Sequence, residues 1–309
     1  MTSNAAPSVV VGIATRNRAA LLSKAIESAQ NQSHLPLRIA VVDDASDDET
    51  PKLRDCFSNV QWHRFDRPYG YVTSRNVLML GANDKYFVSL DDDAWFIEGD
   101  EIALAVEHLE RHSRTAAIAF DILSPDRRNA RPRGSVTQVG MFIGCGHVLR
   151  LSVIRSIGGY RPFPGLYGAE EKDLCLQLLD QGYDIVRLDG VHVWHDKTPV
   201  ARDIPRQHRS GLCNDLSLTV RRAPTALLCM ALAWKLVRHL AFARRSKLVV
   251  PCLLGFGDFL RQLRPIWASR QPVGAATLAR FHALSQSQPT LPDETVPRGV
   301  GFDSGPAAW

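Results

Sequence analysis

The sequence predicts an α/β protein with a mostly parallel central sheet, helices on both sheet faces, and a helical C-terminal extension. Short apolar runs rich in β-branched residues alternate with helical patterns through the N-terminal half, as in sheets of this kind. Acidic clusters directly follow two of these runs. A length of 309 residues with 45% hydrophobic content is enough for one large domain or two modest ones.

The expected elements follow one another in a regular order. Apolar runs predict strands at 8–14, 37–42, 60–65 and 85–90. Apolar residues at helical spacing predict helices at 19–30, 72–82 and about 100–112. Residues 123–135 form a basic, proline-bearing loop. Further on, the chain predicts a strand, a short helix and a glycine stop over 138–163, then a helix ended by Gly182 and a strand over 168–188.

Composition changes along the chain suggest four segments. We expect a disordered start over 1–7, the α/β domain over 8–200, a basic helical region over 201–284 and a loose tail rich in Pro, Gly and Ser over 285–309. The first residues lack the basic and apolar regions of a secretory signal, and the six cysteines form no Cys-x-x-Cys pair. These features predict a cytoplasmic protein with reduced thiols.

Three consecutive carboxylates, Asp91, Asp92 and Asp93, follow the strand predicted at 85–90. On an extended segment Asp91 and Asp93 point to one side and Asp92 to the other. Two carboxylates on one side suit Mg²⁺ or Mn²⁺ held together with a diphosphate. The alternative is a helix N-cap, where the helix dipole stabilises acidic side chains.

Polar residues also follow two neighbouring strands. Thr15, Arg16 and Asn17 come after the first strand, and Asp43 and Asp44 come after the second. In open sheets of this type ligands bind beyond the carboxyl ends of the strands. Convergence of these strand ends therefore predicts a binding crevice, although an Asx turn would explain the aspartates equally well.

Two further clusters carry candidate chemistry. Glu170 and Glu171 begin a predicted helix, where they are either a base aimed at a hydroxyl group or acids stabilised by the helix dipole. His192 and His195 follow a strand and are either metal or phosphate ligands or ordinary strand-end histidines. The Gly144-x-Gly146 pair lacks the third glycine of a dinucleotide fingerprint.

The order of these motifs resembles the family 2 glycosyltransferases of the GT-A fold, which in bacteria often make cell-surface polysaccharides. The resemblance covers about residues 8–200. It rests on six short motifs in the family's order: ATRNR, VVDDAS, SRN, SLDDDAW, GCGHVLRLSVIRSIGGYRPF with GAEEKDLCLQL, and GVHVWH.

The resemblance implies roles for these residues. Thr15 and Asp44 would hold the base of a nucleotide sugar, with Asp43 beside them, and Arg16 and Asn17 remain donor-site candidates from their position after the first strand. Arg75 would approach the donor. Asp91 and Asp93 match the outer residues of the Asp-x-Asp motif, which contact the ribose or sugar and the divalent metal, and Asp92 fills its variable middle position.

The resemblance leaves a choice between two residues for the base and for the histidine. Glu171 takes the place where the family usually has an aspartate base, so either Glu171 or Glu170 would activate the acceptor. His192 or His195 matches a histidine that touches metal or diphosphate in some members.

The resulting expectation is an inverting glycosyltransferase of hexosyltransferase type. It would use Mg²⁺ or Mn²⁺ and a UDP, GDP or dTDP sugar, with a glycan or a lipid-linked molecule as acceptor. The alternative is a catalytically inactive GT-A-like module that binds nucleotide or glycan and scaffolds a polysaccharide assembly complex. No nucleic-acid reader motif is present in the sequence.

Charge is unevenly distributed along the chain. Residues 1–200 hold 22 Lys and Arg against 26 Asp and Glu, a net charge of −4, whereas residues 201–309 hold 15 against 6, a net charge of +9. The apolar run from Thr225 to Trp234 is half the roughly 20 residues needed to span a bilayer, and Lys235 follows it. The region around 225–265 predicts either an interfacial contact with an anionic membrane, on the inner face of the cytoplasmic membrane, or packing on the catalytic domain or in a homodimer.

Overall fold

The computed structural model describes residues 6–166, 168–197 and 203–286. The chain divides into two compact units, one of Met1–Tyr160 with Gly182–Thr198 and the other of Arg161–Gln181 with Pro199–Trp309. The sequence-based boundary at residue 200 leaves 161–181 with the sheet, whereas the structure groups these residues with the C-terminal helices. The expected disordered start and loose tail lie almost wholly outside the described residues.

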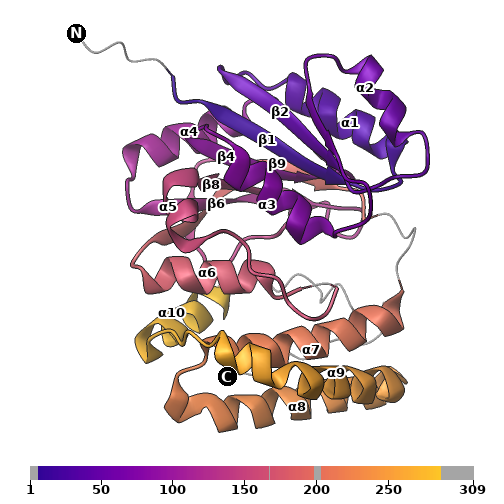
Figure 1. Cartoon of the computed structure of the whole chain (residues 1–309). Helices are drawn as coiled ribbons and strands as arrows, with labels where there is room; N and C mark the ends of the chain where they lie inside the picture. The colour runs from indigo at the N-terminus through magenta and orange to yellow at the C-terminus, as the bar shows by residue number, and fades with distance from the viewer. Residues whose placement is uncertain (1–5, 167, 198–202, 287–309) are drawn as a thin grey trace. The chain divides into compact units, whose positions relative to one another are not determined.

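The first unit is built on a nine-stranded sheet with the order β3-β2-β1-β4-β8-β6-β9-β5, and β7 pairs with β9 (Figure 1). The strands are β1 Val9–Thr15, β2 Leu37–Asp43, β3 Gln61–Arg64, β4 Tyr86–Asp91, β5 Ala94–Phe96, β6 Thr115–Leu123, β7 Val136–Gln138, β8 Gly146–Arg150 and β9 Asp184–His195. Strands β3, β2, β1 and β4 run parallel to one another, and β6 runs parallel to β9. Strands β8, β5 and β7 pair antiparallel.

Helices cover both faces of this sheet, as the sequence predicts. They are α1 Ala19–Gln30, the short η1 Thr50–Lys52 and α2 Leu53–Cys56, α3 Tyr71–Gly81, α4 Glu101–Arg111 and α5 Leu151–Ile157. Val9, Val11 and Ile13 of β1 share one buried cluster with apolar residues of α1 and α4. Gly12 points to the opposite face, where a Cβ atom would come within 2.4 Å of the Phe87 ring and 3.3 Å of Leu78 on α3. Side chains alternate along the strand, so both faces carry a packed layer.

The sequence-based assignment missed strand β6, although all nine of its residues are buried. Its sequence, TAAIAFDIL, contains three alanines, which are depleted in strands and compatible with a helix. Burial between β8 and β9 overrides this weak local preference. The three-residue strands β5 and β7 are too short to show a period in the sequence.

The second unit is helical in the described part of the chain. It contains α6 Glu170–Asp180, α7 Ile204–Arg222, η2 Thr225–Leu227, α8 Leu228–Arg245, α9 Val249–Ala268 and α10 Ala275–Gln286. Buried apolar residues of α7, α8 and α9 form one cluster. Asp173 of α6 accepts two hydrogen bonds from Arg222 of α7, at 2.6 and 3.0 Å, and both side chains are buried. This bidentate pair fixes α6 against α7.

His147 of β8 makes the stability of the first unit sensitive to acid. Its Nε2 lies 2.7 Å from the Tyr160 hydroxyl and its Nδ1 lies 3.0 Å from the Ile143 carbonyl oxygen, so the neutral ring has a partner at both nitrogens. Burial, with the nearby Arg75 guanidinium, lowers the pKa of His147 from 6.5 to about 3. Between these two values the unfolded chain binds one proton more than the folded chain, so falling pH favours unfolding.

We therefore expect lowering the pH from about 6.5 to about 5 to reduce the free energy of unfolding through His147 by about 2 kcal/mol. Urea unfolding of the wild type and of His147→Gln at both pH values measures this, because the variant lacks the titrating ring. Equal pH dependence of the two proteins would contradict the assignment.

Candidate functional site

The carboxyl ends of β1, β2 and β4 lie at the same edge of the sheet. Strand register places Thr15 opposite Asp43 and Ala14 opposite Asp91. Asp92 and Asp93 form the turn from β4 into β5, so the three aspartates do not cap a helix. The helix N-cap alternative is therefore wrong, and the strand ends converge at the acidic turn.

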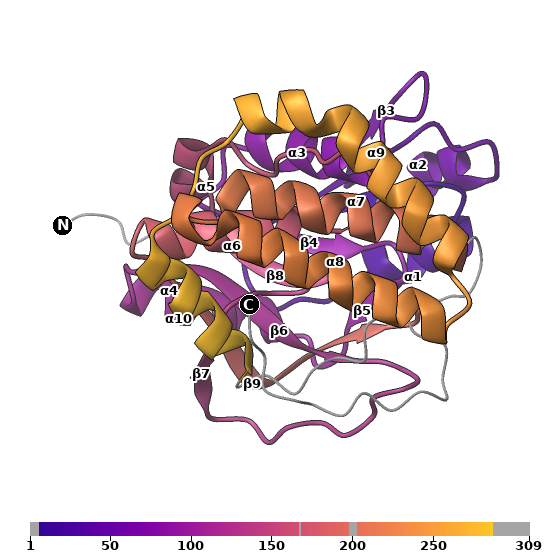
Figure 2. The ribbon, with the colours of Figure 1, turned by 90° about the horizontal axis from the view of Figure 1, so that it is seen from below.

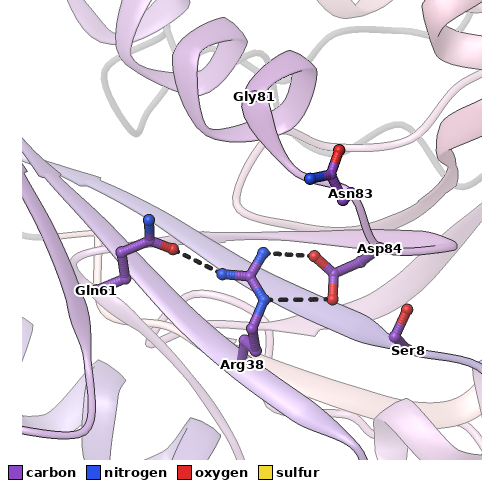
Figure 3. Close-up of a pocket in the computed structure, with 6 residues that line it drawn as sticks. All are labelled: Ser8, Arg38, Gln61, Gly81, Asn83 and Asp84. Carbon is purple, nitrogen blue, oxygen red and sulfur yellow. Dashed lines mark hydrogen bonds and ion pairs between the residues drawn. The ribbon is translucent and has the colours of Figure 1, made fainter.

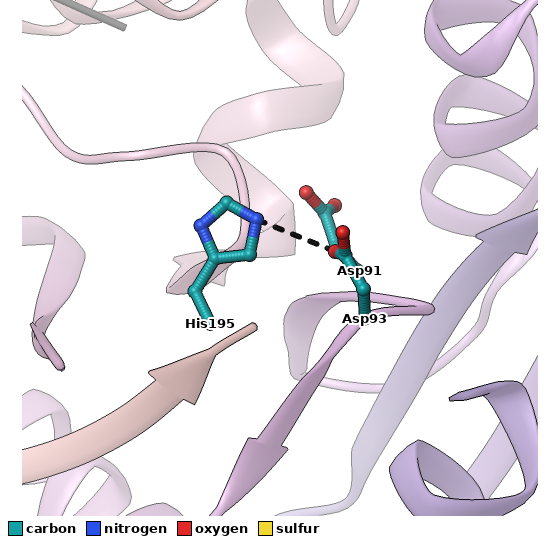
Figure 4. Close-up of side chains that lie close together, drawn as sticks. All are labelled: Asp91, Asp93 and His195. Atoms are coloured by element: carbon teal, nitrogen blue, oxygen red, sulfur yellow. Dashed lines mark ion pairs between the residues drawn. The ribbon is translucent and has the colours of Figure 1, made fainter. Parts of the chain in front are cut away.

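Asp91, Asp93 and His195 form a candidate metal centre (Figure 4). One ligand atom from each residue lies within 4.8 Å of the others. The Nε2 atom of His195 lies 3.3 Å from Oδ1 of Asp93. Antiparallel pairing of β5 with β9 sets Ala94 opposite His195, which brings the histidine to the acidic turn.

Two arginines compensate the three carboxylates. Arg75 of α3, which is buried, lies 2.5 Å from Asp91. Arg18, just before α1, donates from one Nη1 atom to Asp92 at 2.9 Å and to Asp93 at 3.1 Å. Charge-assisted hydrogen bonds of this kind offset the mutual repulsion of the three carboxylates.

Asp92 points away from the candidate metal centre and into the protein. Its Oδ2 atom accepts a hydrogen bond of 2.8 Å from the Thr15 hydroxyl, and the side chain is buried. Burial raises the pKa of Asp92 to about 6, against the opposing effect of the Arg18 charge. The middle aspartate therefore has a structural role at the base of the turn.

The acidic turn favours a positive charge at the position of His195. Burial alone would lower the pKa of His195, but the Cys145 sulfur and the Asp93 carboxylate outweigh burial and raise it to about 11. A divalent cation has the same electrostatic preference for this position. It would bind the neutral imidazole and displace the proton.

His192, three residues earlier on β9, has other partners. Its Nδ1 lies 2.7 Å from Glu98, and its Nε2 lies 3.9 Å from Asp121 on β6. The geometry thus brings His195 to Asp91 and Asp93, whereas His192 lies beside Glu98 and Asp121.

Asp44 and Asp43 shape the loops beside this edge. The two carboxylate oxygens of Asp44 accept backbone N–H groups of Tyr69 and Gly70, at 2.7 and 2.9 Å. Gly70 has a φ of 88°, in the left-handed region that favours glycine, and it directly precedes α3. Asp43 accepts the N–H of Ser46 at 2.8 Å, which is the Asx-type turn considered from the sequence.

Asn17 and Arg16 lie where β1 passes into the following loop. Asn17 has a φ of 56° and accepts the Asp47 N–H at 2.8 Å, while its own N–H donates to Ser46 at 2.9 Å. Arg16 is exposed. Asn17 therefore holds the loop after β1 against the loop after β2, and Arg16 remains accessible to a ligand.

Glu170 and Glu171 belong to the second unit, in the first turn of α6. Glu170 is buried, and Glu171 is half-buried. Ala169 precedes them with a φ of 84°, which turns the chain sharply into the helix. Partial exposure at this turn gives the Glu171 carboxylate the better access to solvent.

A pocket at the opposite edge of the sheet carries no comparable chemistry (Figure 3). It lies at the amino ends of the parallel strands and is lined by Ser8, Arg38, Gln61, Gly81, Asn83 and Asp84. The Arg38 guanidinium is already engaged, 2.5 Å from Asp84 and 2.6 Å from Gln61. The acidic edge is therefore the better candidate.

Sequence reasoning missed Arg18 as part of the site. It singled out the preceding residues of ATRNR and passed over the second arginine. The sequence did offer a signal for Arg18. It is a cation close to the end of the first strand, and three acidic residues follow a neighbouring strand. Cys145, whose sulfur influences His195, carried no such signal.

Comparisons with known proteins agree with this geometry. Residues 10–162 match the model of glycosyl transferase family 2. The chain is 30% identical over 128 residues to the succinoglycan biosynthesis protein ExoO of Rhizobium meliloti (strain 1021), which covers 40% of this chain. The match spans 36% of the length of ExoO.

Solved structures show the fold. The mannosyltransferase PcManGT of Pyrobaculum calidifontis, in complex with GDP-Man and Mn²⁺, superposes with a TM-score of 0.57 at 18% identity, over 91% of this chain and 87% of its own. Residues 1–349 of S. aureus TarS superpose with a TM-score of 0.60 at 16% identity, over 91% of this chain and 84% of that one. These likenesses confirm the expected GT-A fold with its helical extension.

The hydrogen bond from Thr15 to Asp92 provides a test of the acidic turn. Thr15→Val keeps the side-chain shape and removes the donor, so we expect a loss of about 2 kcal/mol in the free energy of unfolding, as for a hydrogen bond to a charged group. Thr73→Val, at an exposed position of α3, is the matched control with an expected change within about 0.5 kcal/mol. Urea unfolding measures both, and similar small changes in the two variants would contradict the role of Thr15.

Proposed function

Residues 10–162 match the model of glycosyl transferase family 2, and on that premise we propose that the chain belongs to this family and is an inverting, metal-dependent enzyme. It would move a sugar from a nucleoside-diphosphate sugar to an acceptor hydroxyl. The observation that carries the proposal is the convergence of Asp91, Asp93 and His195 at the carboxyl edge of the sheet. That edge is where open α/β sheets bind their ligands.

The residues present suit a divalent cation. Two carboxylates supply the hard oxygen ligands that Mg²⁺ and Mn²⁺ prefer, and an imidazole nitrogen favours the transition metal Mn²⁺ over Mg²⁺. Asp91, Asp93 and His195 would hold the ion. When bound, it would neutralise charge on the departing diphosphate. His192 is engaged with Glu98, so we assign the histidine ligand to His195.

The loops beside the metal centre would bind the donor. Asp44 uses one acceptor position on each oxygen for Tyr69 and Gly70, and each oxygen retains a second lone pair for a base N–H. Arg16 is exposed at the same edge and could contact phosphate or ribose. PcManGT with GDP-Man and TarS with UDP-GlcNAc support a nucleotide-sugar donor.

The other residues expected to bind the donor would act indirectly, by fixing the shape of the donor site at the carboxyl edge of the sheet. Thr15 holds Asp92, Asn17 fastens the loop to Ser46, and Asp43 closes the turn to Ser46. Arg75 positions Asp91. In this proposal they orient the groups that contact the donor.

Glu171 is the proposed catalytic base. Inverting transfer needs one carboxylate to take the proton of the acceptor hydroxyl while the sugar leaves on its opposite side. Glu171 stands at the base position of the family motif and is half-buried, whereas Glu170 is buried. A half-buried carboxylate is accessible to an acceptor.

Polysaccharide assembly is the proposed context. The name of ExoO refers to succinoglycan biosynthesis, which supports a glycan or lipid-linked acceptor. The six cysteines form no Cys-x-x-Cys pair in the sequence, which supports a reducing, cytoplasmic location.

Substitution of the two β9 histidines tests the metal centre. His195→Gln removes a ligand, so we expect Mn²⁺ binding in the presence of donor nucleotide to weaken at least about tenfold, as when a metal site loses a supporting contact. His192→Gln is the matched control, on the same strand and equally buried, and should bind Mn²⁺ within about twofold of the wild type. Isothermal titration calorimetry with UDP or GDP measures both, and the reverse order would assign the metal to His192.

Substitution of the two glutamates tests the catalytic base. A donor is first identified by screening hydrolysis of a panel of UDP, GDP and dTDP sugars with Mn²⁺. We expect Glu171→Gln to retain donor binding and to lower turnover by about 10² or more, as for removal of a general base, while Glu170→Gln stays within about tenfold.

Two outcomes would contradict these assignments. Full turnover by Glu171→Gln would remove that residue from the base role. Absence of turnover by the wild type with every donor, combined with intact nucleotide binding, would favour the inactive binding module.

A further inference from the structure

Exposed apolar side chains are concentrated on two helices of the second unit. Among the exposed large apolar residues of the described chain, ten lie on α8 and α9: Met230, Trp234, Val237, Leu240, Val249, Val250, Leu253, Leu254, Leu260 and Trp267. The most exposed of them, Val250, is 66% accessible. Such a concentration of exposed apolar side chains on two neighbouring helices is typical of an interaction site.

These residues share one face of each helix. On α8 they recur at 230, 234 and 237, and on α9 at 250, 253, 254, 260 and 267, which are intervals of three, four and seven residues or close to them. The opposite faces pack inward, with Ala231 and Ala243 of α8 and Cys252 and Phe259 of α9 buried. Helices α8 and α9 contact α7 and each other (Figure 2). We name the exposed surface formed by the ten residues the α8–α9 face.

The same segment is strongly basic. Residues 228–270 contain eight Lys and Arg and one Asp, which gives a net charge of +7. Six of the cations are exposed: Arg238, Arg244, Arg245, Lys247, Arg261 and Arg264. On α9, Arg261 and Arg264 fall within the apolar stripe at helical spacing from Leu254, Leu260 and Trp267. Long cationic side chains beside apolar surface are typical of helices at a membrane interface.

Contacts on the inner face of α8 favour a position of this helix at the membrane interface and not across the bilayer. By length and composition Thr225–Arg245 could cross a bilayer, contrary to the expectation from the shorter run that ends at Trp234. However, Lys235 and His239 of α8 lie 3.0 and 3.2 Å from Asp215 of α7. Crossing the hydrocarbon layer would break these ion pairs, whereas a position in the plane of the interface keeps them.

We infer that the α8–α9 face binds the surface of a lipid bilayer that contains anionic lipids. The apolar side chains would enter the boundary between headgroups and acyl chains, and the surrounding arginines would contact lipid phosphates. A second copy of the chain is a poorer occupant, because an interface between two such faces would bring two segments of charge +7 together. An anionic surface complements that charge.

Cosedimentation of the full-length protein with vesicles tests this inference. We expect binding to vesicles of phosphatidylcholine with phosphatidylglycerol, weaker binding in high salt, and little binding to phosphatidylcholine alone. Arg244→Gln/Arg245→Gln, which alters exposed side chains, should weaken binding roughly 25-fold, at about fivefold for each charge.

Matched apolar substitutions separate a membrane contact from a general loss of hydrophobicity. Val250→Ser/Leu253→Ser on α9 should weaken vesicle binding several-fold. Val77→Ser/Leu80→Ser on α3 of the sheet unit makes the same change at the same spacing and should leave binding unaltered, because both residues are exposed outside the α8–α9 face. Thermal unfolding of each variant confirms that it is folded.

Three outcomes would overturn the inference. These are absence of binding to anionic vesicles, equal binding to neutral vesicles, and a dimer in sedimentation velocity that dissociates on Val250→Ser/Leu253→Ser while lipid binding is nil. The last would assign the face to an interface between copies. A fourth outcome would also overturn it: resistance of vesicle-bound protein to extraction by high salt and alkaline carbonate would indicate insertion across the bilayer.

Discussion

Compensation of three adjacent carboxylates is the constraint on which the sheet unit depends. Asp91, Asp92 and Asp93 would repel one another at the end of β4 if nothing opposed their charge. Arg75 lies against Asp91, and Arg18 bridges Asp92 and Asp93. These two arginines come from α3 and from the start of α1, so the charges at the turn also fix the helices that flank it.

This compensation leaves one direction open to a cation. Asp92 turns inward to Thr15, and Asp91 and Asp93 turn toward His195. The protein thus directs Asp92 to Thr15 and the other two carboxylates to His195, with Asp93 buried and Asp91 half-buried. Burial would lower the pKa of His195, but Cys145 and then Asp93 outweigh burial and raise it to about 11. A site that stabilises imidazolium also stabilises a metal ion.

The sequence predicted the alternating strands and helices because each carried a clear period or a glycine stop. It predicted the meeting of Thr15, Asp43 and Asp91 because parallel strands end at a common edge. It could not distinguish His192 from His195. Both lie on β9, and their partners, Glu98 and Asp93, are fixed by tertiary pairing. It also missed β6, whose alanines become strand residues through burial.

Charged and apolar residues are distributed differently in the helical unit and in the sheet unit. In the sheet unit charge is concentrated at one edge and opposed by neighbouring side chains. In the helical unit the Asp173 and Arg222 pair and the Asp215 cluster satisfy the interior, and the exposed face remains apolar and basic. Folding alone does not require ten large apolar side chains on the surface, because buried residues of α7, α8 and α9 already form a core. Their persistence beside exposed arginines is explained by a partner that offers both hydrocarbon and negative charge, which a lipid bilayer does.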